Sequence, residues 1–200
     1  MNKDDLLKHI AETAYNVGFG AKKHFATFDI VSKAPGLISF ISLAFGIYAL
    51  VIDSLNTKLI SATLIIIGVI GLYISFYDSK KNDYAENGRE LTDLFNELKR
   101  LYGSVKGSSS PTTEHLTKLE EIERKYTQVS SSQQILFGNW YAHYKFFWEQ
   151  QIEWIDEQKK FSFWRDKIPL SFSLLISAIL IVILFCASNF SMHYCNWITK

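Results

Sequence analysis

The hydrophobic pattern of the chain is dominated by three long apolar runs, which alternate with charged segments of helical periodicity. The runs cover residues 35–52, 59–77 and 168–190, they contain 18, 19 and 23 residues, and none of them contains a charged residue. About 20 helical residues are needed to cross a hydrocarbon core that is about 30 Å thick. Each run therefore predicts a transmembrane helix. The alternative, a core helix of a soluble domain, is disfavoured because such domains seldom hold three runs of this kind.

The connection between the first two runs, and the charges beside all three, predict how the chain lies in a membrane. Only residues 53–58 separate the first two runs, so residues 35–77 are predicted to form a two-span helical hairpin. Near the runs, nine basic residues fall on one side and two, Lys58 and Lys200, on the other. The nine are Lys22, Lys23, Lys33, Lys80, Lys81, Lys159, Lys160, Arg165 and Lys167. Because basic residues are enriched on the cytoplasmic side, we expect the N-terminus inside and the C-terminus in the periplasm.

The N-terminal segment predicts an amphipathic helix. Apolar residues recur through residues 1–34 at three- and four-residue steps, which places them on one helix face. Gly18 and Gly20 are expected to weaken the middle of this helix. We therefore expect a cytoplasmic helix that leads into the first span.

The segment after the second span predicts further helices with two breaks. The second span is expected to continue as a helix, with Gly88 as its weak point. Residues 103–112 predict a flexible loop, and Ser110 followed by Pro111 predicts the N-cap and first position of the next helix. The polar residues 130–134 predict a second break.

Residues 137–164 are unusually aromatic, with 11 aromatic side chains in 28 residues. Trp140, Tyr144 and Trp148 recur at four-residue steps, so we expect them to share one face of a helix. This face is predicted to be covered either by other helices of the chain or by a neighbouring subunit, since aromatic residues are enriched at interface hot spots. We favour the core position, and the sequence leaves the oligomer interface open.

Charge and motif content argue against several classes of function. The net charge is +1, and residues 78–167 carry 14 basic against 15 acidic residues, without the basic face of a nucleic-acid-binding protein. The chain has no phosphate-binding glycine loop, nucleophile elbow or HExxH motif. Cys186 and Cys195 lack the spacing of a zinc site. We therefore expect no catalytic residues, no metal, no cofactor and no nucleic-acid partner.

Small residues inside the runs are candidate positions for span packing or for a pore lining. Such residues let helices approach closely in lipid. The set comprises Ser42, Gly46, Gly68, Gly71, Ser75, Ser173 and Ser177. No ionisable residue lies inside a run, which argues against a secondary transporter or a pump. A pore lined by Ser, Thr and backbone groups, or an oligomer that perturbs the membrane, stays compatible with the sequence.

The order of these segments resembles the SLATT family of bacterial membrane effectors, the SMODS- and SLOG-associating transmembrane effector domains. The resemblance covers about the first 130 residues and rests on AETAYNVGFGAKKHF at 11–25, the hairpin at 35–77, NDYAENGRELTDLFNELKRLY at 82–102 and HLTKLEEIERKYTQV at 115–129. It implies a toxic effector of antiviral defence that breaches the inner membrane when a sensor protein or a nucleotide second messenger triggers it. The third run and the aromatic stretch depart from the family pattern.

The sequence thus predicts an all-α membrane protein in five parts. They are an N-terminal amphipathic cytoplasmic helix (1–34), a two-span transmembrane hairpin (35–77), a cytoplasmic helical region (78–167), a third, C-terminal transmembrane helix (168–190) and a short external tail (191–200). The resemblance implies a homo-oligomer in the bacterial inner membrane that permeabilises the lipid bilayer and is not an enzyme. The alternative is a membrane anchor or scaffold that recruits a cytoplasmic partner through its aromatic helices without forming a pore.

Overall fold

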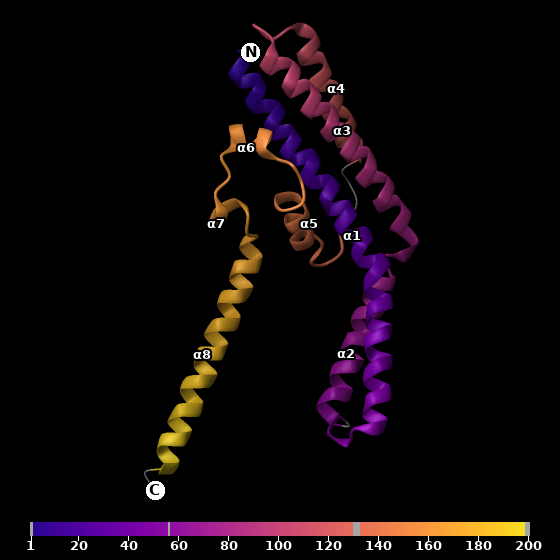
Figure 1. The fold of residues 1–200 in the computed structure, drawn as a ribbon, viewed down its shortest axis with the longest axis vertical. Helices are drawn as coiled ribbons and strands as arrows, with labels where there is room; N and C mark the ends of the chain where they lie inside the picture. Colours follow the sequence, from indigo (N-terminus) through magenta and orange to yellow (C-terminus); the bar gives the residue numbers. More distant parts are fainter. Residues whose placement is uncertain (1, 56, 130–132, 199–200) are drawn as a thin grey trace. The chain divides into compact units, whose positions relative to one another are not determined.

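The computed structural model describes residues 2–55, 57–129 and 133–198, with side chains as far as residue 185. This part of the chain consists of helices and holds no strand (Figure 1). It forms two compact units, Met1–Lys160 and Phe161–Lys200. The all-α class predicted from the sequence is confirmed.

The first helix, α1 (Lys3–Val51), is the longest element and runs through both the N-terminal segment and the first predicted span. Asn2 caps it, because the Asn2 side chain accepts a hydrogen bond from the backbone N–H of Asp5 at 2.8 Å. At a rise of 1.5 Å per residue, its 49 residues extend about 74 Å. Pro35 lies inside α1 without ending it. The predicted lead-in helix and the first span are therefore one helix.

The second span follows after a short turn. It forms α2 (Lys58–Ser75), which begins at the N-cap Thr57, whose hydroxyl accepts a hydrogen bond from the N–H of Ile60 at 3.3 Å. The one-turn 3₁₀ helices η1 (Asp53–Leu55) and η2 (Asp78–Lys80) lie at its two ends. The next helix, α3 (Lys81–Gly107), begins directly after η2, so the helix that was predicted to continue from the second span is divided at residues 76–80.

Two predicted boundaries in this region are wrong. Helix α3 continues through Gly107, so the predicted loop at 103–112 is helical in its first half. The next helix, α4 (Thr113–Val129), begins after Thr112 and not after Ser110. The Thr112 hydroxyl accepts from the N–H of His115 at 3.4 Å, and the His115 Nδ1 accepts from the N–H of Thr112 at 3.2 Å. These two hydrogen bonds satisfy the backbone N–H groups of Thr112 and His115 at the start of α4.

Helix α1 forms the centre of a helical head, which we define as residues 3–34 and 81–160. Helices α3, α5 (Gly138–Phe147) and α6 (Glu153–Lys159) contact α1, and α4 packs mainly on α3. The core is made of side chains at helical spacing from these elements. Its fully buried members include Leu6, Ile10, Val17, Tyr84, Leu91, Leu98, Ile122, Phe146 and Ile155.

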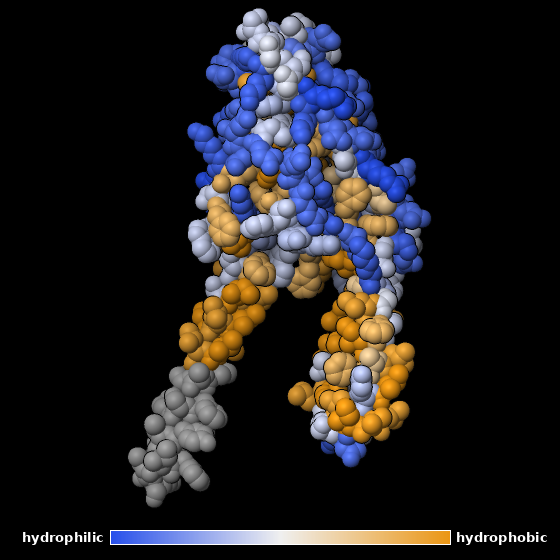
Figure 2. All heavy atoms as spheres, viewed as in Figure 1, coloured by the Kyte–Doolittle hydropathy of each residue, from blue (hydrophilic) through white to orange (hydrophobic). Residues whose placement is uncertain are grey.

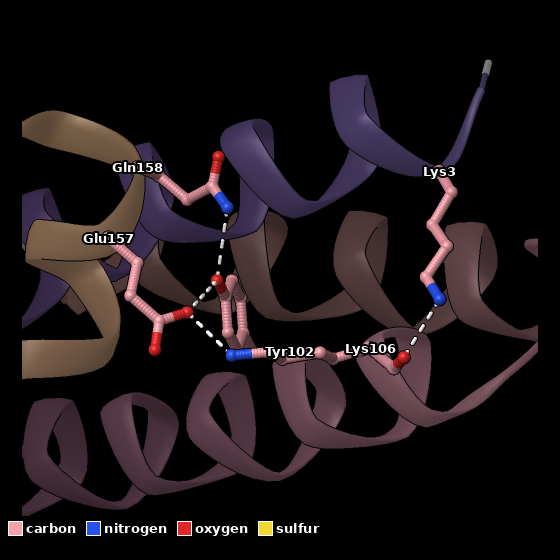
Figure 3. Close-up of polar contacts among 5 residues, drawn as sticks. All are labelled: Lys3, Tyr102, Lys106, Glu157 and Gln158. Carbon is pink, nitrogen blue, oxygen red and sulfur yellow. Dashed lines mark hydrogen bonds and ion pairs between the residues drawn. The ribbon is translucent and has the colours of Figure 1, made fainter.

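Polar contacts fasten the end of the head that carries the N-terminus (Figure 3). The Tyr102 hydroxyl of α3 donates to a Glu157 oxygen at 3.0 Å and accepts from the Gln158 side chain at 3.1 Å. Lys106 Nζ lies 2.7 Å from the same Glu157 oxygen, and Lys3 Nζ donates to the Lys106 carbonyl at 2.8 Å. These contacts join α1, α3 and α6 at this end.

The second unit contains α7 (Phe163–Asp166) and α8 (Leu170–Ile198). From Leu170 to Phe185, α8 is an apolar helix. Its backbone stays helical past residue 190, where the predicted span ends. The side chains of Cys186, Cys195 and the predicted tail lie outside the described residues.

Candidate functional site

The hairpin exposes apolar side chains on nearly all sides. In the described part of the chain, Lys3–Val51 and Lys58–Gly107 are long and apolar enough to cross a membrane, and their most apolar windows are 0% and 6% buried. Exposed fractions reach 86% at Leu50 and 77% at Leu59. Figure 2 shows this apolar surface on the hairpin, below a mainly polar head. A core helix of a soluble domain would bury these residues, so lipid is the solvent that fits them.

Several serines and threonines of the hairpin and of α8 donate hydrogen bonds to their own helices. Ser75 donates to the Gly71 carbonyl at 3.0 Å, and Ser39 donates to the Pro35 carbonyl at 2.9 Å. In α8, Ser177 donates to Ser173 at 2.9 Å, and Ser173 donates to Pro169 at 3.4 Å. Each of these hydroxyl groups therefore has an acceptor within its own helix and needs neither water nor a second helix. This lowers the free-energy cost of placing the side chains in lipid.

Of the candidate glycines, one lies at the contact inside the hairpin. A Cβ at Gly71 would lie 3.6 Å from Ile38 Cγ2 of α1, which is ordinary contact distance. A Cβ at Gly46 or at Gly68 would meet nothing within 4 Å. Ser42 is half-buried and Ser75 is exposed. The structure therefore uses Gly71 in hairpin packing, while Gly46 and Gly68 face outward.

The head and the hairpin meet in a small apolar cluster, which we call the junction cluster. Its buried residues are Val31 of α1, Ile74 of α2 and Ile135 of the segment before α5, with 3%, 6% and 3% exposed. The Tyr73 hydroxyl of α2 accepts a hydrogen bond from the Leu136 N–H at 3.4 Å. The sequence offered no clear signal for Ile135, because the apolar run 135–137 is short and follows a polar stretch. This contact ties the α4–α5 connection to the end of the second span.

A charged contact joins α1 to α5 near the junction cluster. The Asp29 carboxylate lies 2.8 Å from Lys145 Nζ and 2.7 Å from Lys33 Nζ. Partial burial alone would raise the pKa of Asp29, but the hydrogen bonds from the two lysines outweigh it and the pKa is lowered. Burial likewise opposes the charge of Lys145, yet the Asp29 carboxylate raises its pKa. Both groups are charged at neutral pH, and the pair holds α5 against α1.

A polar pocket of 200 Å³ opens between α1, α3 and α4. Its lining residues are Asn16, Phe19, Gly20, Lys23, His24, Leu91, Tyr126 and Gln134. His24 is 2% exposed. Burial lowers its pKa, and the neighbouring Lys23 charge lowers it further. His24 is therefore neutral in the folded head at neutral pH.

Replacing His24 with Gln is expected to make the stability of the head less sensitive to acid. Because the folded-state pKa is lowered, the unfolded chain binds more protons once the pH falls below about 6.5. The stability that neutral His24 contributes is thus present above that pH and is lost as the pH falls toward the folded-state pKa. Thermal unfolding of detergent-solubilised wild type and His24→Gln between about pH 7.5 and 5.5 measures this. Equal slopes for the two proteins would contradict the expectation.

The helix face of Trp140, Tyr144 and Trp148, which is predicted from the sequence to lie in the core, is largely exposed. Tyr144 and Trp148 are 52% and 61% exposed, and Trp140 is half-buried. The opposite side of α5, with Gly138, Ala142 and Phe146, is the buried one. A Cβ at Gly138 would lie 3.3 Å from Thr27 Oγ1, so α5 approaches α1 closely, and only small residues fit there. Tyr144 and Trp148 therefore lie outside the core of the single chain, Trp140 lies at its edge, and the interface alternative stays a prediction.

Among the described residues, no three His, Cys, Asp or Glu side chains are grouped so that they could hold a metal ion. The Glu97 carboxylate, largely buried, lies 3.0 Å from Lys118 Nζ. Glu97 and Lys118 thus form an ion pair that joins α3 to α4.

The geometry defines a class of protein, a helical head on a hairpin of two lipid-exposed helices. The chain belongs to the family described as SMODS and SLOG-associating 2TM effector domain 6, whose model matches residues 1–176. This confirms the resemblance seen in the sequence and extends it over the aromatic stretch, which is therefore not a departure from the family. No curated protein and no solved structure matches the chain.

Proposed function

We propose that the protein is an oligomeric effector of bacterial antiviral defence, which permeabilises the inner membrane when it is activated. Membership of a family of two-span effector domains carries this proposal. The fold supports it, because α1 runs unbroken from the head into the first span and α3 follows α2 after one turn. A conformational change in the head would therefore act on both spans through α1 and α3.

Assembly is part of the proposal, since two or three helices are too few to enclose a water-filled pore. Gly46 and Gly68 leave open notches on the outer surface of the hairpin, where a second helix could approach closely. On the head, Tyr144 and Trp148 present exposed aromatic surface of the kind found at interfaces. We assign these two regions to contacts between subunits.

The orientation we propose follows from the basic residues. The head carries most of them, so the N-terminus and the head lie in the cytoplasm. Helix α8 then forms a third span, and the C-terminus lies in the periplasm. In this arrangement, the activating partner is a cytoplasmic sensor protein or a nucleotide second messenger that acts on the head.

The proposal is tested by expressing the protein in bacteria that carry a voltage-sensitive dye. Expression together with its trigger, or strong overexpression, is expected to depolarise the cells before growth stops. A scaffold that only recruits a partner would leave the membrane potential unchanged, and that result would favour the alternative function.

Replacing Gly46 with Leu is expected to weaken both assembly and depolarisation. The Cβ of the new side chain meets nothing within 4 Å in its own subunit, so the hairpin should insert normally while the open space beside Gly46 is filled. Gly71→Leu serves as the comparison, because it enlarges a residue that touches Ile38 inside the hairpin and should lower the amount of folded protein as well. Membrane level, crosslinked oligomer and dye signal are measured for both variants. If Gly46→Leu assembles and depolarises like the wild type, the Gly46 notch is not an interface.

A further inference from the structure

An apolar cavity of 370 Å³ lies beside the junction cluster, and nothing in the proposed function uses it. Three elements line it, with Ile30 from α1, Val69, Ile70, Tyr73 and Ile74 from α2, and Ile135, Leu136 and Phe137 from the segment before α5. All eight residues belong to the first unit of the chain. Apart from the Tyr73 hydroxyl, every side chain in this lining is hydrocarbon. Its size falls within the range of about 300–1,000 Å³ that is common for ligand pockets.

The position of the cavity along the hairpin decides what can fill it. Val69 and Ile70 are 59% and 48% exposed on the last turns of the second span, and Leu72 is 67% exposed. The apolar surface of α2 therefore continues from the lipid into the cavity without a polar boundary. Water is disfavoured against this apolar lining, because it would lose hydrogen bonds there. The acyl chain of a neighbouring lipid forms no hydrogen bonds, so it loses none when it enters this site.

The segment that closes the cavity is built to face lipid. Leu136 and Phe137 are 63% and 54% exposed, although both are large and apolar. Phe137 takes a left-handed backbone conformation with φ 64°, which is rare for a bulky side chain. Its carbonyl accepts the N–H groups of Trp140 and Tyr141 at 3.0 and 3.2 Å, so the start of α5 holds the turn. The turn keeps two apolar side chains at the level of the span end.

We propose that this cavity binds an acyl chain of a phospholipid from the leaflet on the head side of the membrane. The exposed wall of α2 guides the chain in, and Leu136 and Phe137 cover it from the other side. A bound lipid would then be part of the contact between the α4–α5 connection and the second span. The inference holds for either an effector or a scaffold, and its test is independent of depolarisation.

The experiment uses the full chain in vesicles of phosphatidylcholine that contain a diazirine on one acyl chain. After illumination, trypsin cleaves at Lys125 and Lys145, so that one peptide, residues 126–145, carries Ile135, Leu136 and Phe137. Adducts on this peptide are counted relative to adducts on the peptide of the second span, residues 59–80. We expect the wild-type peptide 126–145 to carry the lipid adduct at Leu136 or Phe137.

Two variants separate a bound chain from general contact with lipid. Val69→Phe puts a ring into the cavity and is expected to reduce the adduct at Leu136 and Phe137 to the level that contact with bulk lipid gives. Leu72→Phe makes the same kind of change one turn away on an exposed residue outside the lining, and it should leave the adduct unchanged. Equal labelling in all three proteins would show that the segment touches bulk lipid only and would overturn the proposal. No adduct in the wild type would also overturn it, because another helix or a second subunit would then occupy the cavity.

Discussion

Truncating Phe146 to Ala is expected to lower the free energy of unfolding by about 3–5 kcal/mol, whereas Trp148→Ala should leave folding almost unchanged. Phe146 is fully buried. Its ring packs against Tyr15, Phe19 and Phe147 at centroid distances of 5.4, 5.9 and 5.2 Å. Removing it leaves a cavity at the centre of the α1–α5 contact, while Trp148 is 61% exposed and leaves none.

Two readouts together test this difference. Thermal unfolding and membrane level report folding, and they should fall for Phe146→Ala alone. Native gels of the solubilised protein report assembly, which Trp148→Ala is expected to disrupt if this residue contributes to the subunit contact. Equal loss of folded protein in both variants would show that Trp148 supports the fold after all. Normal folding with normal assembly of Trp148→Ala would remove it from the interface.

Replacing Gly18 with Leu is the second change for which we expect a large effect. A Cβ at Gly18 would lie 2.7 Å from Phe95 Cδ2 and 3.0 Å from Phe146 Cε2. Phe95 and Phe146 are 2% and 0% exposed, so neither ring can move aside without disturbing the core. Overpacking of this kind costs about 1–3 kcal/mol, and a full Leu side chain should reach the upper end of that range or exceed it.

Gly103→Leu provides the matched control. Gly103 is also a helical glycine of the head, but a Cβ there meets nothing within 4 Å. Leu favours a helix interior over Gly by up to about 1 kcal/mol, so this variant should be slightly more stable than the wild type. The two substitutions are thus expected to shift the unfolding temperature in opposite directions. A loss of stability in both would mean that side-chain size at Gly18 is not the cause.

The two spans of the hairpin could be predicted from the sequence because the composition of residues 35–52 and 59–77 is enough to identify them. An uncharged run of about 20 residues has few stable places other than a bilayer. The roles of the glycines were harder to predict. Helix propensity marks Gly18 as a weak point of its helix, whereas the packing around Gly18 requires a residue without a side chain. Helix propensity describes an isolated helix, and it contains no information on the ring of Phe95 that approaches from α3. The same holds for Gly88, where a Cβ would lie 3.0 Å from Phe25.

The aromatic stretch shows why the site could be predicted only in part. The four-residue spacing of Trp140, Tyr144 and Trp148 predicts that they share one side of α5, but the size of these side chains does not determine which side of the helix is buried. Gly138 and Ala142 allow α5 to approach α1 closely, and the Phe146 ring packs on α1 from the same side, whereas Tyr144 and Trp148 lie on the exposed side. The junction cluster escaped prediction for a related reason. Ile135 acquires its role from Val31 and Ile74, which lie far from it in the sequence.

The unbroken α1 has a mechanical consequence for any signal that reaches the head. The hydrogen bonds of a helix resist stretching and twisting along its axis. A displacement at one end of the 49-residue α1 is therefore expected to reach the other end. A rotation imposed at Val17 turns Leu50 by nearly the same angle and presents a different side of the span to its surroundings. Pro35 removes one hydrogen bond of the ladder, which permits bending there but little independent rotation. A rotation of the head about the axis of α1 is therefore expected to turn the first span with it, because α1 is continuous from Lys3 to Val51.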